Sequence, residues 1–122
     1  MVDRGKLAEI DFIRLCLREG WDVYTPVTAA GPVDVIFGTG SRLQRAQVKR
    51  GYVQDSDPGI VRVDLRRSTP DRAAYAPDTI DVLVVVYDDY FWIIPWAEVG
   101  DRFLSIPLAS ADSKYEAWRR KA

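Results

Sequence analysis

The chain has 122 residues, with 17 basic and 18 acidic side chains, one cysteine, no histidine and a formal net charge of −1. One cysteine excludes an internal disulfide, and the lack of histidine excludes Ser-His and Cys-His catalysis and histidine-bound zinc. No apolar run approaches the roughly 18 residues that span a membrane, so we expect one cytoplasmic domain over residues 1–122, using carboxylates, Lys, Tyr or a hard metal ion for any catalysis.

The N-terminal half predicts a helix followed by a hairpin. Over residues 4–19 apolar side chains recur at helical spacing, with Asp3 as N-cap and Gly20 just past the end. The apolar positions of this helix are Leu7, Ala8, Phe12, Ile13, Cys16 and Leu17. We expect Cys16 to be a buried thiol rather than a nucleophile. Further along we expect a strand over 21–25, a loop over 28–32, and a hairpin of strands 33–37 and 43–50 around a turn at 38–41.

The C-terminal half predicts more strands and a final helix. The continuous apolar run at 80–87 indicates a strand buried on both faces. The expected elements are a loop at 54–59, a strand at 60–65, a loop or broken helix at 66–77, the strand 80–87, a turn at 88–89, a strand at 90–94, a helical turn at 95–99, a strand at 103–108 and a helix at 113–122. This order predicts an α/β fold with a central mixed β-sheet flanked by helices.

Charge is unevenly distributed along the chain. Residues 41–77 carry +4 and residues 102–122 carry +3, whereas residues 1–40 carry −2 and residues 78–101 carry −6. The basic middle and tail either form one positive face for a polyanion or are spread around the surface, and the sequence leaves both open. Arginines suit phosphate contacts because the guanidinium group is planar and always charged. The candidate DNA-binding arginines are Arg42, Arg45, Arg50, Arg62, Arg66 and Arg67.

The predicted hairpin gathers polar groups on one face. Side chains alternate along a strand, so Gln47 and Lys49 share a face of the second strand. If the valines on the other face are core, Asp34 from the first strand converges on Gln47 and Lys49. A carboxylate, an amide oxygen and an ammonium group would then lie together. The plainer interpretation is that Asp34 caps the hairpin and the other two form a solvated strand face.

Glu9 favours a site over that plainer interpretation. Its neighbours on the helix, at i+3, i+4 and i+7, are Phe12, Ile13 and Cys16, so a glutamate interrupts the apolar stripe. A glutamate is rarely buried without a partner, and we therefore expect Glu9 to face a cation, either a bound metal ion or Lys49.

These residues resemble the PD-(D/E)XK nuclease motif: Asp34, then Gln47-Val48-Lys49, with Glu9 in a leading helix. Within that superfamily the chain is similar, over nearly its whole length, to the group I intron-associated endonuclease branch, which has Gln where most members have Asp or Glu. The matching stretches are 6–9, 20–23, 32–36, 47–49, 75–95 and 113–118. Archaeal Holliday junction resolvases share the helix and hairpin but carry an acid at the position of Gln47. Pro32 also stands one residue further from Asp34 than the motif expects.

The resemblance implies a restriction-endonuclease-like core and Mg²⁺-dependent hydrolysis of DNA phosphodiester bonds, with Mn²⁺ as a substitute ion. The implied metal ligands are Glu9, Asp34, the Gln47 side-chain oxygen and the Val48 carbonyl. Lys49 would position or deprotonate the attacking water and stabilise charge on the phosphate. The implied catalytic set is therefore Glu9, Asp34, Gln47 and Lys49, in an enzyme encoded by a phage or mobile element.

Two functional hypotheses follow. The first is an endonuclease, either a site-specific enzyme of the homing type or a Holliday junction resolvase, acting as a homodimer or higher symmetric oligomer because two strands require two active sites. The second is a non-catalytic DNA-binding module of the same fold, which the neutral Gln47 favours and the presence of Glu9, Asp34 and Lys49 opposes. We expect Asp78 and Asp81 to cap the strand that follows them rather than to lie near a partner subunit, and we place the tryptophans in the core or a subunit interface.

Overall fold

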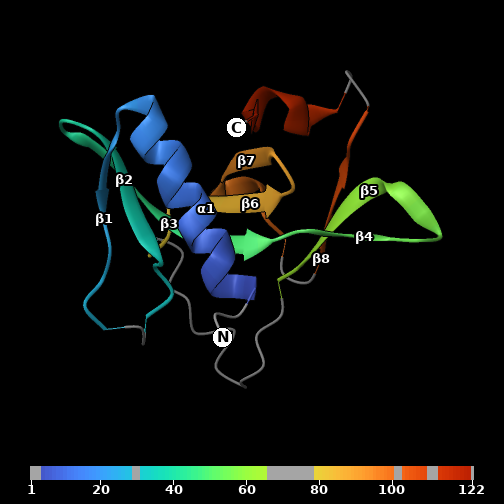
Figure 1. The fold of residues 1–122 in the computed structure, drawn as a ribbon, viewed down its shortest axis with the longest axis horizontal. Helices are drawn as coiled ribbons and strands as arrows, with labels where there is room; N and C mark the ends of the chain where they lie inside the picture. The colour runs from blue at the N-terminus through green and yellow to red at the C-terminus, as the bar shows by residue number, and fades with distance from the viewer. Residues whose placement is uncertain (1–3, 29–30, 66–78, 101–102, 110–112, 122) are drawn as a thin grey trace.

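The structure is a computed structural model that describes residues 4–28, 31–65, 79–100, 103–109 and 113–121 (Figure 1). One α-helix opens the chain, and nine strands and two short 3₁₀ helices follow among the described residues. In chain order these are α1 (Arg4–Glu19), β1 (Asp22–Tyr24), β2 (Val35–Thr39), β3 (Arg42–Arg50), β4 (Tyr52–Gln54), β5 (Asp57–Asp64), β6 (Val82–Tyr87), β7 (Tyr90–Pro95), η2 (Trp96–Glu98), β8 (Phe103–Pro107), η3 (Lys114–Trp118) and β9 (Arg119–Lys121). No helix in the described ranges is long and apolar enough to cross a membrane.

Helix α1 spans the predicted residues and ends in a hydrogen-bonded cap. Gly20 has φ of +78°, which costs little without a Cβ atom. Its N–H donates to the carbonyl of Leu17, and the N–H of Trp21 donates to the carbonyl of Cys16. This pair of bonds is the Schellman motif, which satisfies carbonyls that the end of a helix leaves without partners. The predicted helix end at Gly20 is thus confirmed, and Trp21 is fixed directly beyond it.

The buried face of α1 differs from the predicted stripe. The buried residues are Ala8, Phe12, Leu15 and Cys16, spaced i, i+4, i+7 and i+8. Leu7 and Leu17 were predicted to be apolar contacts but are exposed. Burial raises the pKa of the Cys16 thiol to about 12, which keeps it protonated near neutral pH. The expectation that Cys16 is a buried thiol is confirmed.

The main sheet is mixed and has six strands in the order β1-β2-β3-β6-β7-β9. Among the strands that the structure describes in this sheet, only the β3–β6 pair is parallel, and the other four pairs are antiparallel. Strand β6 is buried at Val82 through Val86, as its continuous apolar run predicted. Because both faces of β6 are buried, other elements of the protein must cover the main sheet on both of its faces.

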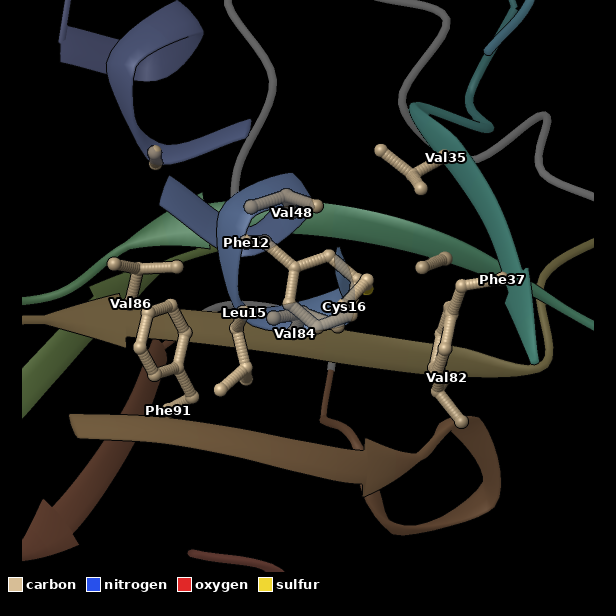
Figure 2. Close-up of a cluster of buried hydrophobic side chains, with 12 residues drawn as sticks. Phe12, Leu15, Cys16, Val35, Phe37, Val48, Val82, Val84, Val86 and Phe91 are labelled. Atoms are coloured by element: carbon tan, nitrogen blue, oxygen red, sulfur yellow. The ribbon is translucent and has the colours of Figure 1, made fainter. Parts of the chain in front are cut away.

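Different layers cover the two faces of the main sheet. Helix α1 packs over β3 on one face, and the small sheet β4-β5-β8 covers the other (Figure 1). Figure 2 shows the α1 side chains gathered over β6, flanked by side chains of β2 and β7. The second core contains Val61, Val63, Leu65, Leu83, Val85, Trp92, Ile94, Leu104 and Ile106. Trp92 is fully buried there, and the other three tryptophans are half-buried against one core or the other.

The predicted mixed sheet is confirmed, but two expectations for the C-terminal half are wrong. The predicted helix over 113–122 is a 3₁₀ helix of five residues, Lys114–Trp118, followed by β9, which pairs with β7. The backbone hydrogen bonds that β7 offers at its open edge outweigh the helical pattern. Residues 54–59, predicted as a loop, instead hold the end of β4 and the start of β5. The expected element at 66–77 falls outside the described residues.

Gly51 marks the point where the chain passes from the main sheet into the small one. Its N–H donates to the carbonyl of Val86 at 2.8 Å, while its Cα faces the second core. A Cβ atom at this position would overlap Cγ1 of Val61 and would lie 3.3 Å from Cγ1 of Val85. Since Val61 is fully buried and stiff at χ1, it cannot move aside cheaply.

We predict that Gly51→Ala lowers the free energy of unfolding by about 1–3 kcal/mol, the range for overpacking a core. Chemical denaturation with urea measures the change. Gly59→Ala is the matched control, because a Cβ on Gly59 meets nothing within 4 Å. Equal unfolding midpoints for the two variants would contradict the close packing of Gly51 against Val61 of β5.

Candidate functional site

The β2–β3 pairing places Asp34 opposite Gln47. Val35 pairs with Ala46 in the antiparallel ladder, so the residue before Val35 faces the residue after Ala46. The backbone N–H of Asp34 donates to the carbonyl of Ala46 at 2.8 Å, so the same register continues to the end of the ladder. Asp34 therefore lies just before β2 begins, and its side chain extends beyond the last strand pair.

Val48 holds the carboxylate of Asp34 in place. The Val48 N–H donates to Oδ2 of Asp34 at 2.8 Å. In a strand, the N–H and C=O of one residue point toward the same neighbouring strand. The Val48 carbonyl is therefore directed toward the Asp34 side of β3 as well. A carboxylate oxygen and a backbone oxygen are thus brought to one edge of the sheet.

Gln47 and Lys49 share the other face of β3. They pair with Leu83 and Val85 of β6, which belong to the second core, so their side chains point away from α1. Gln47 is 8% exposed and Lys49 is half-buried. The predicted alternation along β3 is confirmed, with Ala46 and Val48 in the α1 core.

Burial raises the pKa of the Asp34 carboxyl above its ordinary value of 3.8, and the charge of Glu9 raises it further. The hydrogen bond from Val48 and the charges of Lys49 and Lys6 act in the opposite direction, but they do not cancel the effect of burial. These interactions show that Glu9, Lys49 and Lys6 lie close enough to Asp34 for their charges to act on it. Two carboxylates near one another in a half-buried place favour a bound cation.

Glu9 lies at the margin of the buried face of α1 rather than in its centre. Its side chain is 22% exposed, and Oε1 lies 3.6 Å from Nζ of Lys6, one turn earlier. Its partner in the structure is therefore Lys6, not Lys49. Because the Lys6 side chain is 62% exposed, this ion pair is weak, and Glu9 remains able to bind another cation.

The donor chemistry fits a divalent hard cation. No group of three or more His, Cys, Asp or Glu side chains comes together among the residues that the structure describes. The candidate oxygen donors in this region are the carboxylates of Asp34 and Glu9, the Gln47 amide oxygen and the Val48 carbonyl. Mg²⁺ prefers oxygen ligands and often takes one or two carboxylates while keeping several waters. Two carboxylates with neutral oxygens match that preference.

Three of the candidate DNA-binding arginines form ion pairs within the protein. Arg50 donates from Nη2 to Asp11 at 3.1 Å and from Nε to the carbonyl of Arg4 at 3.3 Å, which fastens α1 to β3. Arg62 pairs with Asp57 at 3.1 Å on the small sheet. Arg42 is exposed at the start of β3. Arg66 and Arg67, like Asp78, lie outside the described residues.

Arg45 forms the most extensive ion pair. Its Nε and Nη2 donate to the two carboxylate oxygens of Asp81, each at 3.1 Å, and its backbone N–H donates to Oδ2 at 2.8 Å. The side-chain hydrogen bonds from Arg45 hold the pKa of Asp81 below its ordinary value. Asp81 caps the start of β6, as predicted, but sequence reasoning missed its partner. The position of Asp81 directly before an apolar strand was the sequence signal for its capping role. Its pairing with Arg45 could not be read from the sequence, because it is the parallel register of β3 and β6 that brings the two residues together.

The chain matches the sequence model of one family, described as "PD-(D/E)XK endonuclease", over residues 2–120. Among solved structures, it is similar to a bacterial homing endonuclease, I-Ssp6803I, with a TM-score of 0.74 and 20% sequence identity. That similarity covers 98% of this chain and 88% of the other. No curated protein gives a significant match.

We predict that Asp34→Asn stabilises the metal-free protein. The amide oxygen still accepts the Val48 hydrogen bond, while the buried negative charge beside Glu9 is removed. A carboxyl whose pKa is raised by folding is destabilising above that raised pKa and neutral below its ordinary value of 3.8. The midpoint of unfolding in EDTA should therefore rise in the variant at pH 8, and the difference should vanish below pH 3.8.

Asp55→Asn is the control, because Asp55 is an exposed turn residue whose carboxylate has no hydrogen bond or ion pair with the residues that the structure describes. We expect little change in this control at either pH. A loss of stability in Asp34→Asn at pH 8 would show that the carboxylate is stabilising, and would argue against a site poised for a cation.

Proposed function

The chain belongs to the PD-(D/E)XK endonuclease family, and we propose that it is a Mg²⁺-dependent DNA endonuclease whose centre comprises Glu9, Asp34, Gln47 and Lys49. The observation that carries this proposal is the Asp34 carboxyl, held by Val48 and acted on by the charges of Glu9 and Lys49. The half-buried carboxyl of Asp34 lies at the open end of the hairpin, where neighbouring oxygen atoms can bind a cation and Lys49 can contact a phosphate.

The proposed ligands are the carboxylates of Asp34 and Glu9, the Gln47 side-chain oxygen and the Val48 carbonyl. A bound Mg²⁺ would supply Lewis acidity and lower the pKa of a bound water. Mn²⁺ has similar ligand preferences and is expected to substitute. Gln47 brings an oxygen without a charge, so the ligand set carries two negative charges rather than three. We therefore expect weaker metal binding than a site with three carboxylates would give.

Lys49 acts on the phosphate in this mechanism. Its ammonium group lies on the same strand face as Gln47, two residues on, and can contact a phosphate oxygen. A positive charge there offsets the negative charge that develops on the phosphate as water attacks. Lys49 can also orient that water by a hydrogen bond. Asp34 contributes a fixed carboxylate, since the bond from Val48 prevents its rotation.

Arg50 has a positioning role in this proposal. By pairing with Asp11 it fastens α1 to β3, the strand that carries Gln47 and Lys49. Glu9 is two residues before Asp11, so the same contact limits how far Glu9 can move from Asp34. The distance between the helix and the hairpin is thereby set by an ion pair rather than by apolar packing alone.

We propose site-specific cleavage of duplex DNA in the manner of homing enzymes, with cleavage of four-way junctions as the alternative. The likeness to a homing endonuclease structure supports the first form. One chain offers one such centre, and cutting both strands requires two. We therefore also propose a homodimer or a higher symmetric oligomer, which light scattering after size-exclusion chromatography would measure.

We predict that Lys49→Ala lowers the rate of Mg²⁺-dependent DNA cleavage by about 10²–10⁴-fold, because an isolated charge or proton-transfer group contributes that much. The substrates are a labelled four-way junction and a pool of random linear duplexes, each with Mg²⁺ or with EDTA. Cutting by the wild type should require Mg²⁺. A preference for the junction would identify a resolvase.

Lys114→Ala is the matched control, because Lys114 is an exposed lysine of η3 paired with Glu98 at 3.6 Å. We expect it to cleave at the wild-type rate. DNA binding without cleavage of either substrate by the wild type would favour either the second candidate, a DNA-binding module that keeps the fold, or a homing enzyme whose one target site is absent from the pool. The neutral Gln47 is the feature that supports this second candidate.

A further inference from the structure

A pocket of about 410 Å³ lies where the C-terminal end of α1, the β2–β3 hairpin and the C-terminal segment meet. Figure 1 shows the elements that supply its lining: the upper end of α1, the β2–β3 hairpin and the segment marked C. Trp21, just beyond the helix cap, contributes one wall, and Trp118 of η3 contributes another. Ile93 of β7 also lines it. The volume falls within the range of pockets that bind small ligands.

The charged residues that line the pocket are all arginines. They are Arg42, Arg119 and Arg120, and no lining residue is acidic. Arg120 pairs with Glu19 at 3.7 Å and lies over the Trp21 ring, 4.9 Å from its centroid. Arg119 pairs with Glu116 at 3.0 Å. Each guanidinium has five N–H donors, so these single pairs leave donors for a ligand.

Arg42 faces this pocket without a partner among the described residues. No hydrogen bond, ion pair or ring contact of Arg42 is present there, although Arg45, Arg50 and Arg62 are all paired. Arg42 belongs to the basic stretch 41–77, whereas Arg119 and Arg120 belong to the basic tail 102–122. The two basic segments of the sequence therefore meet at this pocket. Such convergence favours an anionic ligand.

We propose that the pocket binds one unpaired nucleotide of the DNA substrate, with the phosphate on the arginines and the base against Trp118. Arginine forks suit phosphate oxygens, and aromatic side chains stack on bases. A base within a duplex is covered by its neighbours, so an indole can reach its face only when the base is unstacked. A nucleotide-sized hollow beside Trp118 therefore takes a nucleotide that has left its stack, either at the branch of a junction or flipped out of a duplex.

This inference rests on the proposed function but concerns a different part of the molecule. Asp34 lies at one end of the hairpin and Arg42 at the turn end, eight residues apart in sequence. Asp34 and Thr39 are separated by five strand residues, or about 17 Å at roughly 3.3 Å each. That distance corresponds to about five base-pair steps of duplex B-DNA, which rise roughly 3.4 Å each. The pocket would hold a nucleotide away from the scissile bond.

The test is binding of a fluorescein-labelled single-stranded 12-mer, measured by anisotropy in EDTA so that no cleavage occurs. We expect Arg42→Gln to raise Kd about tenfold, as the loss of one charge-assisted hydrogen bond predicts. The slope of log K against log salt should fall by about 0.7, the value for one phosphate of a single strand. Trp118→Leu, which keeps an apolar side chain, should raise Kd about tenfold by removing the stacking surface.

Arg14→Gln is the matched control, because Arg14 is an exposed arginine of α1 that lines a different hollow beside Asp88. It should leave Kd unchanged. Equal Kd for Arg42→Gln and Arg14→Gln would overturn the proposal. The proposal would also be overturned if the protein bound a blunt duplex but not the 12-mer, or if Arg42→Gln dissociated an oligomer. Competition by free deoxyadenosine monophosphate as strong as that by unlabelled 12-mer at the same concentration would likewise overturn it, because the ligand would then be a free nucleotide rather than DNA. A failure of Lys49→Ala to slow cleavage would instead count against the proposed function and leave these affinities standing.

Discussion

Strand β3 runs between β2 on one side and β6 on the other, and its register with both is the constraint on which the rest of the structure depends. Ala46 pairs with Val35 in β2 and with Val82 in β6, and all three are buried. A slip of one residue would turn Gln47 and Lys49 into the α1 core and expel Ala46 and Val48. The cost of burying those polar groups therefore fixes the register, and the register places Asp34 beside Val48.

The same site illustrates a conflict between stability and function. The backbone holds the Asp34 carboxylate in a half-buried place near Glu9, where burial and like charge oppose its ionisation. Nothing in the fold requires a carboxylate there, since an amide could accept the same hydrogen bond from Val48. A charge kept at such a place is characteristic of a site that binds a cation or a reacting group.

Arginines serve two separate purposes in this protein. Arg45 and Arg50 connect elements to one another: Arg45 links β3 to the start of β6 through Asp81, and Arg50 links β3 to α1 through Asp11. Both contacts keep the elements around the proposed centre in position. The arginines that we propose for an external anion lie at the opposite end of the hairpin, where Arg42 meets the C-terminal strand. The formal net charge of −1 gives no indication of these two separate groups of arginines.

The sequence by itself determined α1, the β2–β3 hairpin, the buried strand β6 and the nearness of Asp34 to Gln47, because each follows from local periodicity, turn residues and alternation. Tertiary structure alone decided three other features. The open edge of β7 turned residues 119–121 into a strand, since unpaired backbone groups there outweigh a short helical pattern. The parallel β3–β6 register joined Arg45 to Asp81, 36 residues apart. The return of the C-terminal segment to the end of α1 brought Arg42, Arg119 and Trp21 around one pocket. Such long-range contacts depend on how layers pack, and local sequence patterns carry no information about that packing.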